Sequence, residues 1–140
     1  MGGEHSIEGL KTIRSAFGPG ETLDRLTTEI NSRGMTIFAR INHAALAADA
    51  GLTLPPTEVI LFGNPRGGTP LMQVNQTIGI DLPLKALVWQ DLSGTTWMSF
   101  NEPEWLATRH YISGHGAVIG GMNKVLGAVA AVVAGRPPEK

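Results

Sequence analysis

The segment 84–100, LKALVWQDLSGTTWMSF, decides the fold because it contains two strand-like runs on either side of a short turn. Leu92-Ser93-Gly94 separates residues 84–91 from residues 95–100, a composition that is typical of a hairpin. The two strands of a hairpin run antiparallel. The segment therefore predicts a mostly antiparallel sheet and argues against a parallel, doubly wound one.

Strand-like patterns also occur at residues 8–15, 35–42 and 57–63. Every second residue from Met35 to Ile41 is aliphatic, and this period of two places Arg40 on the opposite side of the strand. Residues 59–62 are apolar without interruption between Pro56 and Gly63, a pattern that suits a central strand covered on both faces. We therefore expect about five strands.

Apolar residues recur at helical spacing in the segments 20–33, 103–110 and 117–134, and an alanine-rich stretch at 43–50 predicts a further short helix. Residues 63–68 read as a turn, after which Thr69 and Pro70 resemble the cap and first residue of a helix. Asn101 and Glu104 resemble a capping box. Together these patterns predict a single α+β domain over residues 1–135, with 136–140 as a frayed tail.

The composition excludes several classes of protein. Of the 140 residues, 42% are hydrophobic and 16% charged, as in a globular domain. The net charge is −1 and no two basic residues are adjacent, so we expect no nucleic-acid partner. Cysteine is absent, which removes disulfides, thiolate catalysis and cysteine-ligated metals.

Two segments bear on location. Residues 1–10 lack the continuous apolar run of a secretory signal, so we expect a cytoplasmic protein. Residues 117–134 are long and apolar enough to span a membrane, but Lys124 near the middle and the internal glycines oppose insertion. We therefore expect no membrane contact and interpret this segment as a core helix.

Four residues at predicted loops or element ends are the candidates for ligand binding: His43, Asn64, Arg66 and His110. The glycine-rich turn 63–68 leads into a helix N-terminus, where free amides and Arg66 would favour an anion. If the second and third strands are neighbours, His43, Asn64 and Arg66 share one rim. The alternative is that the turn only shapes the backbone and that Arg66 is solvated.

Metal and enzyme chemistry have weaker support. The four histidines lack metal-ligand spacing, and we expect no metal and no cofactor. No nucleophile motif is present, so catalytic residues are unknown. An enzyme would have to pair His43 or His110 with Asp81 or Glu58 for acid–base chemistry, and no spacing selects one pair.

A series of ordered blocks resembles the family known as domain of unknown function 302. The blocks are Leu54-Pro55-Pro56-Thr57-Glu58-Val59, Phe62-Gly63-Asn64-Pro65, Gly68-Thr69-Pro70-Leu71-Met72, Ile80-Asp81-Leu82-Pro83-Leu84-Lys85, Trp89, Trp97, Trp105-Leu106 and Arg109-His110. The resemblance implies a fold similar to the TATA-box-binding-protein class, in which a curved antiparallel sheet carries helices on one face. It also implies a homodimer, and it supplies no catalytic residues.

The first functional hypothesis is therefore a non-catalytic ligand-binding or assembly module: a cytoplasmic homodimer that holds a small anionic or amphipathic ligand. Three tryptophans in a small domain also favour a homodimer, because tryptophan is enriched at interfaces. The alternative is a small enzyme with His/Asp acid–base chemistry and Arg66 orienting an anionic substrate. Convergence of those side chains in one pocket would favour the enzyme.

Overall fold

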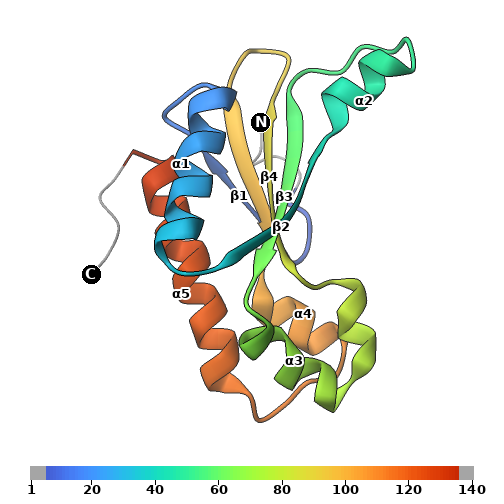
Figure 1. Cartoon of the computed structure of the whole chain (residues 1–140), viewed down its shortest axis with the longest axis vertical. Helices are drawn as coiled ribbons and strands as arrows, with labels where there is room; N and C mark the ends of the chain where they lie inside the picture. Colours follow the sequence, from blue (N-terminus) through green and yellow to red (C-terminus); the bar gives the residue numbers. More distant parts are fainter. Residues whose placement is uncertain (1–5, 136–140) are drawn as a thin grey trace.

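The fold is an open five-stranded antiparallel sheet with five α-helices, and the computed structural model describes residues 6–135 (Figure 1). The predicted tail at 136–140 lies outside the described residues. The elements in chain order are β1 (Leu10–Arg14), α1 (Pro19–Ser32), β2 (Thr36–Asn42), α2 (His43–Asp49), β3 (Thr57–Gly63), α3 (Pro65–Val74), the 3-10 helix η1 (Gln76–Ile80), β4 (Leu84–Gln90), β5 (Thr96–Asn101), α4 (Pro103–Arg109) and α5 (Gly116–Val133).

The strands lie in the order β1-β5-β4-β3-β2, and each of the four pairings is antiparallel. The predicted hairpin forms as β4 and β5, with Trp89 opposite Trp97. The fold class predicted from the sequence, α+β with helices on one face of an antiparallel sheet, is confirmed.

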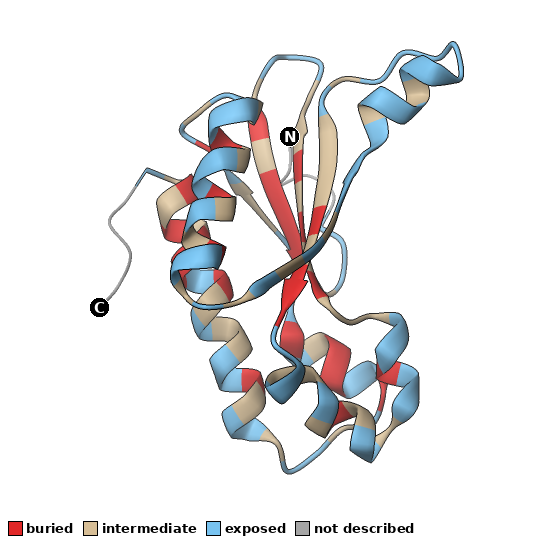
Figure 2. Cartoon of the chain, viewed as in Figure 1, coloured by how far each residue is buried: buried red, intermediate tan, exposed pale blue. Residues whose placement is uncertain are grey.

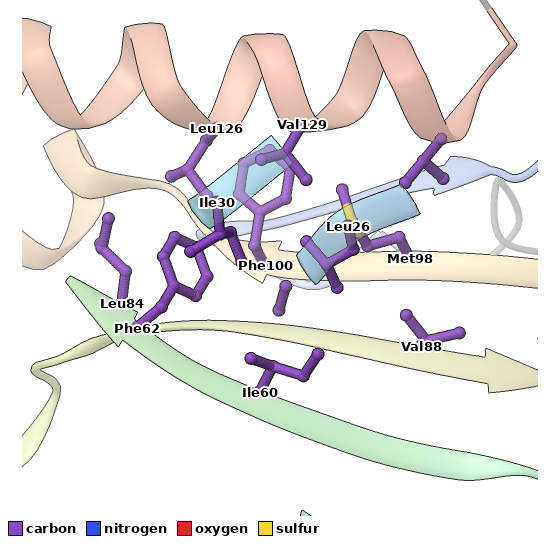
Figure 3. Packing of buried hydrophobic residues seen from close by; sticks show 12 residues of the cluster. Leu26, Ile30, Ile60, Phe62, Leu84, Val88, Met98, Phe100, Leu126 and Val129 are labelled. Carbon is purple, nitrogen blue, oxygen red and sulfur yellow. The ribbon is translucent and has the colours of Figure 1, made fainter. Parts of the chain in front are cut away.

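The main core lies between one face of the sheet and the helices α1 and α5 (Figure 3). Leu26 and Ile30 of α1 and Val129 of α5 are completely buried against it. The strands contribute every second side chain, as the pleat requires. These strand residues are Ile60, Phe62, Leu84, Ala86, Val88, Met98 and Phe100.

A second, smaller core lies at one end of the molecule, where α3, η1 and α4 gather beside the N-terminal part of α5 (Figure 1). Its buried members are Leu71, Ile78, Leu106, Ala107 and Ile119.

Two helices at this end of the structure start differently from the sequence prediction. α3 begins at Pro65, so the expected turn 63–68 is its first turn and Thr69 lies inside the helix. α4 has Glu102 as its N-cap without a side-chain cap, so the capping box proposed for Asn101 does not form.

Strand β2 contains a bulge that overturns its predicted alternation. Ile37 pairs with Phe62, but Ala39 pairs with the adjacent Leu61, so Phe38 is an extra residue. An inserted residue shifts the following side chains to the other face of a sheet. Ala39 and Ile41 therefore face away from the helix-covered side, and Arg40, which pairs with Ile60, is on the covered side. The prediction that the whole strand has one aliphatic face was therefore wrong.

The other face of the sheet carries no helix formed by the described residues, although it is also apolar. Val59 and Leu61 of β3 point to it and are half-buried, while Ile60 and Phe62 on the opposite side are completely buried. The expectation that β3 is covered on both faces is therefore wrong for the described chain. The apolar run of β3 arises because both faces of the sheet are apolar and only one of them meets helices.

The helix α5 is long and apolar enough to cross a membrane by length and composition, with a mean hydropathy of 1.6. One side of this helix packs into the main core, where Leu126, Val129 and Val133 are at most 1% exposed. The side that faces away is formed by small residues and Lys124. In this fold α5 therefore serves as a core helix.

Candidate functional site

The structure does not bring the four candidate residues together. Asn64 and Arg66 line one hollow, and His43 lines another on the uncovered face of the sheet. His110 lies in neither lining and is buried. Strands β2 and β3 are neighbours as supposed, but they run antiparallel, so the residue after β2 and the residues after β3 lie at opposite ends of the sheet. The prediction that His43, Asn64 and Arg66 share one rim was therefore wrong.

We call the first hollow the α3 pocket. It has a volume of about 630 Å³, within the range of small-molecule sites. It lies where the end of β3 and the start of α3 meet α5, the end of α1 and the segment before β4. Most of its lining is apolar, and the apolar side chains are Met35, Phe38, Pro65, Met72, Leu82, Pro83, Leu84, Val118, Met122 and Val125.

Asn64 shapes the entrance of this pocket. Its side-chain oxygen accepts a hydrogen bond from the amide of Arg66 at 2.9 Å, and its carbonyl accepts from the amides of Gly67 and Gly68. Asn64 is thus the N-cap of α3, followed by Pro65 at the first helical position. Since these amides already have acceptors, the free helix N-terminus that the sequence suggested is not available to an anion.

Two arginines supply the charge at the α3 pocket. Arg33, at the end of α1, is half-buried and donates to Glu29 at 2.7 Å, so its charge is compensated. Arg66 is exposed and makes no ion pair among the described residues. None of the described residues that line the pocket is acidic. The pocket therefore combines apolar walls with one uncompensated cation at its mouth.

His110 is the centre of a polar network at the small core. Its Nε2 atom lies 2.6 Å from Asp81 Oδ2 and its Nδ1 atom 2.9 Å from Thr77 Oγ1. Because a carboxylate can only accept, Nε2 carries the proton of the first bond. Arg109 donates to the same Asp81 oxygen at 2.7 Å, and Asn75 donates to the His110 carbonyl at 2.8 Å. The network joins the end of α4 to both ends of η1.

Burial alone would raise the pKa of Asp81, but the hydrogen bond from His110 and the positive charge of Arg109 outweigh it. The pKa of Asp81 is consequently held below its ordinary value of 3.8. Carboxylate, imidazole and hydroxyl follow one another as in an acid–base relay. No described member of this network lines either hollow, so the contacts fasten α4 to η1 without facing a substrate space.

The remaining acid–base candidates are apart from this network. Glu58 accepts from Arg40 at 2.8 Å across β2 and β3. His43 is exposed at the start of α2. Among residues 6–135 no three histidine, aspartate or glutamate side chains cluster closely enough to hold a metal ion. The Asp81–His110 pair is thus the one predicted acid–base pair that meets in the described structure.

We call the second hollow the sheet groove, a space of about 900 Å³ on the uncovered face. Trp89 and Trp97 stack there with ring centroids 6.2 Å apart. Their indole nitrogens donate to Ser99 and Asp91, both at 2.9 Å. With these donors satisfied, the tryptophans present mainly apolar ring surface.

Arg33 and the methionines of the α3 pocket were not predicted from the sequence, and neither was Thr77 as a partner of His110. The pocket is assembled from segments that are remote in sequence, so no local spacing could have revealed it. Thr77 did carry a local signal: its hydroxyl and amide both contact the Asn75 side chain, an Asn-x-Thr turn that residue patterns can identify.

Named relatives of this chain include channel proteins of Brucella. Over 102 residues, 73% of this chain, it is 52% identical to "Fluoride-specific ion channel FluC 1" of Brucella suis and of Brucella abortus, and to "Fluoride-specific ion channel FluC 2" of Brucella melitensis. The chain spans only 38–40% of the length of these relatives.

A solved structure has the same fold. It is the uncharacterized conserved protein DUF302 from Bacillus stearothermophilus, with a TM-score of 0.80 at 21% identity over 91% of this chain and 99% of that one. The sequence model of "Domain of unknown function DUF302" matches residues 11–132, nearly the whole described chain. The resemblance inferred from the ordered blocks is therefore confirmed, and this chain belongs to the DUF302 family.

Proposed function

We propose that this chain is a non-catalytic binding domain that holds a small amphipathic anion in the α3 pocket. One observation carries the proposal: an apolar pocket of ligand size has the uncompensated guanidinium of Arg66 at its mouth and no acidic residue in its described lining. Apolar walls with a few oriented polar groups are typical of small-molecule sites. The anionic group of the ligand would face Arg66 and its apolar part would enter between β2, α3 and α5.

The walls favour a flexible, linear ligand over a rigid one. Met35 immediately precedes β2, Met72 lies on α3 and Met122 lies on α5, and all three contribute unbranched, polarizable side chains. Methionine adapts to ligands of varied shape, so such a lining suits an alkyl chain. A guanidinium binds carboxylate and phosphate in bidentate fashion, and both head groups are compatible with the site.

The test begins with native mass spectrometry of freshly purified protein, which reports any co-purified ligand. Thermal shift is then measured with a medium-chain carboxylate and with the alcohol of equal chain length. We expect the acid to raise the melting temperature of the wild type more than the alcohol does, because only the acid pairs with Arg66. In Arg66→Ala this difference should disappear.

Arg25→Ala is the matched control, since Arg25 is also exposed but lies on α1 with Glu21 and Phe17, away from the pocket. Its response to the acid should equal that of the wild type. Equal shifts in the wild type and in Arg66→Ala, or no shift with either compound, would remove the support for this site.

The domain is further proposed to be a homodimer located in the cytoplasm. The apolar and uncovered face of the sheet supports self-association, because monomeric proteins rarely expose large apolar patches. Light scattering at tens of micromolar should give twice the mass of one chain. Cell fractionation of the expressed full-length chain tests its location.

The Brucella relatives are named as fluoride-specific ion channels. We propose that this chain by itself forms no fluoride pathway, because α5, its one described helix with the composition of a membrane span, buries Leu126, Val129 and Val133 in the main core. Proteoliposomes prepared with this chain alone should therefore show no fluoride efflux above that of empty vesicles. Efflux above that level would contradict the proposal.

An enzyme is the second candidate function, and the contact of Asp81 with His110 favours it. Such an enzyme would need the Thr77 end of the network to open to a substrate. If a screen of hydrolytic substrates finds turnover in the wild type that Thr77→Ala abolishes while the melting temperature is unchanged, the enzyme replaces the binding domain as the proposed function.

A further inference from the structure

Two apolar features of this chain have no partner among residues 6–135. The first is the segment 43–54, which consists of α2 and the turn after it and which we call the α2 arm. It projects away from the body of the molecule (Figure 1), and none of the residues of α2 is buried (Figure 2). The arm exposes three leucines: Leu46 at 57%, Leu52 at 67% and Leu54 at 42%.

The arm is nevertheless well formed. Asn42 caps α2 by accepting from the amide of Ala45 at 3.0 Å, and Gly51, with φ of +78°, ends the helical turn. The amide of Leu52 then folds back to the carbonyl of Ala47 at 2.8 Å. A helix of seven residues is marginal in water without packing contacts. The order of the arm therefore calls for a surface against which its leucines pack.

The second feature is the sheet groove. On its floor Val59 and Leu87 are half-buried and Trp89 stacks with Trp97, so the uncovered face presents apolar surface where an antiparallel sheet usually presents polar side chains. Lys11 and Lys85 also line the groove. Its one acid among the described residues, Asp91, already accepts from the Trp97 indole.

We propose that the α2 arm of one copy packs into the sheet groove of a second copy, and that the second arm does the same in return. The inference rests on the homodimer of the proposed function and names its interface. A two-fold symmetric exchange buries the leucines of both arms and covers both grooves, because each copy contributes one arm and one groove. It also closes the assembly at two chains.

Size and charge agree with this partner. A seven-residue helix is about 10 Å long, and α2 is thin because alanine is its commonest residue, so it fits a groove of about 900 Å³. Asp49 is the only acidic residue of segment 43–54. It would meet a groove lined by Lys11, which forms no ion pair among the described residues. The match is therefore apolar at the centre and complementary in charge at the rim.

His43, the first residue of the arm, lines the groove of its own chain, but the three leucines of the arm do not reach it. α2 follows β2 directly, and the Asn42 cap holds the helix in the direction in which the strand leaves the sheet (Figure 1). Folding back over Val59 and Leu87 would require that cap to break. Exchange with a second copy leaves the backbone of the arm as it is.

The first test measures self-association by sedimentation equilibrium for the full chain and for Leu46→Asp. We expect the substitution to weaken the dimer by at least about 30-fold, because a charge would enter an apolar groove. Ile80→Asp is the matched control: Ile80 is 75% exposed on η1, at the opposite end of the molecule. It should leave the dissociation constant unchanged.

The second test uses the absence of cysteine from the chain. Leu46→Cys in one copy and Val59→Cys in a separately tagged copy are mixed and oxidised, and a crosslinked heterodimer is expected only in the mixture. The double variant Leu46→Cys/Val59→Cys should likewise form disulfides between chains. A disulfide within one chain, or no crosslink in the mixture, would overturn the inference.

The outcomes separate the two levels of the proposal. A wild type with the mass of one chain would remove the homodimer and this interface together, while ligand binding in the α3 pocket would stand. A dimeric wild type with an equally strong Leu46→Asp dimer would remove the interface alone.

Discussion

The two faces of the sheet are built from similar side chains but have different surroundings. On the covered face Ile60, Val88 and Met98 are at most 1% exposed beneath α1 and α5. On the other face Val59, Trp89 and Trp97 are only half-buried and line an open groove. An apolar strand residue therefore does not by itself report burial within the chain. The uncovered side thus exposes more apolar surface than the covered side, and the proposed dimer would cover it.

Matched leucine substitutions on the two faces of β4, three residues apart, give the largest expected effect and test this comparison directly. Leu84→Ala removes a leucine that is 5% exposed in the main core, and we expect it to lower the free energy of unfolding by about 2–5 kcal/mol. Leu87→Ala affects the uncovered face, and in dilute monomer it should cost about 1 kcal/mol. Urea unfolding of both variants provides the measurement.

The concentration dependence sharpens this result. If the sheet groove is filled by a second copy, Leu87→Ala should become more costly as the protein concentration rises, because the lost contacts belong to the dimer. The cost of Leu84→Ala relative to the wild type should stay constant. Equal costs for the two substitutions in dilute solution would show that the uncovered face is covered within the single chain.

The next effect concerns the Asp81 network at the small core, in which Arg109 and His110 contact the same carboxylate oxygen. Asp81→Asn should lower the free energy of unfolding at neutral pH by about 1–3 kcal/mol, since it weakens two charge-assisted hydrogen bonds in a side chain that is 15% exposed.

The pH dependence of this effect has a definite sign. The pKa of Asp81 is lower in the folded chain than its ordinary 3.8, so its stabilising contribution is complete above that pH and is lost as pH falls through the folded pKa. The difference between wild type and Asp81→Asn should therefore be constant near neutral pH and shrink below about pH 4. A difference that persists unchanged in acid would show that the carboxylate charge contributes nothing.

Sequence patterns predicted the regular elements well, because local propensity and hydrogen bonding within each element determine them. The hairpin around Leu92-Ser93-Gly94 and the helices now seen at 19–32, 103–109 and 116–133 all lie within two residues of their expected bounds. The start of α3 was misplaced because two segments, Asn64-Pro65 and Thr69-Pro70, each offer a cap followed by proline. The helix begins at Asn64-Pro65 because β3 ends there, and the position of that strand end is set by the tertiary structure.

The candidate site was less predictable, because it depends on pairing direction and on long-range assembly. Asn64 and Arg66 do lie together at a pocket, but His43 is at the other end of the antiparallel pair β2 and β3, and His110 serves the small core. The bulge at Phe38 has no distinctive residue pattern, yet it decides which face Ile41 joins. The position of each candidate residue and the location of the bulge depend on how the strands pair, and not on the residues adjacent in sequence.

The smallest expected effect compares the two arginines at the end of the covered face, Arg33 and Arg66. Arg33→Ala breaks the 2.7 Å ion pair with Glu29, and since both side chains are partly exposed, at 26% and 15%, we expect a loss of about 0.5–1 kcal/mol in the free energy of unfolding. Arg66→Ala removes an exposed side chain with no ion partner in the described chain, and the loss should stay below about 0.5 kcal/mol.

Ligand binding should reverse the order of the two variants. A carboxylate that stabilises the wild type should stabilise Arg33→Ala nearly as well and Arg66→Ala much less, because the charge of Arg33 is already compensated. Urea unfolding with and without the carboxylate separates the two roles. If Arg33→Ala loses the ligand effect and Arg66→Ala keeps it, the anion binds at the end of α1, and the assignment of its charge to Arg66 is wrong.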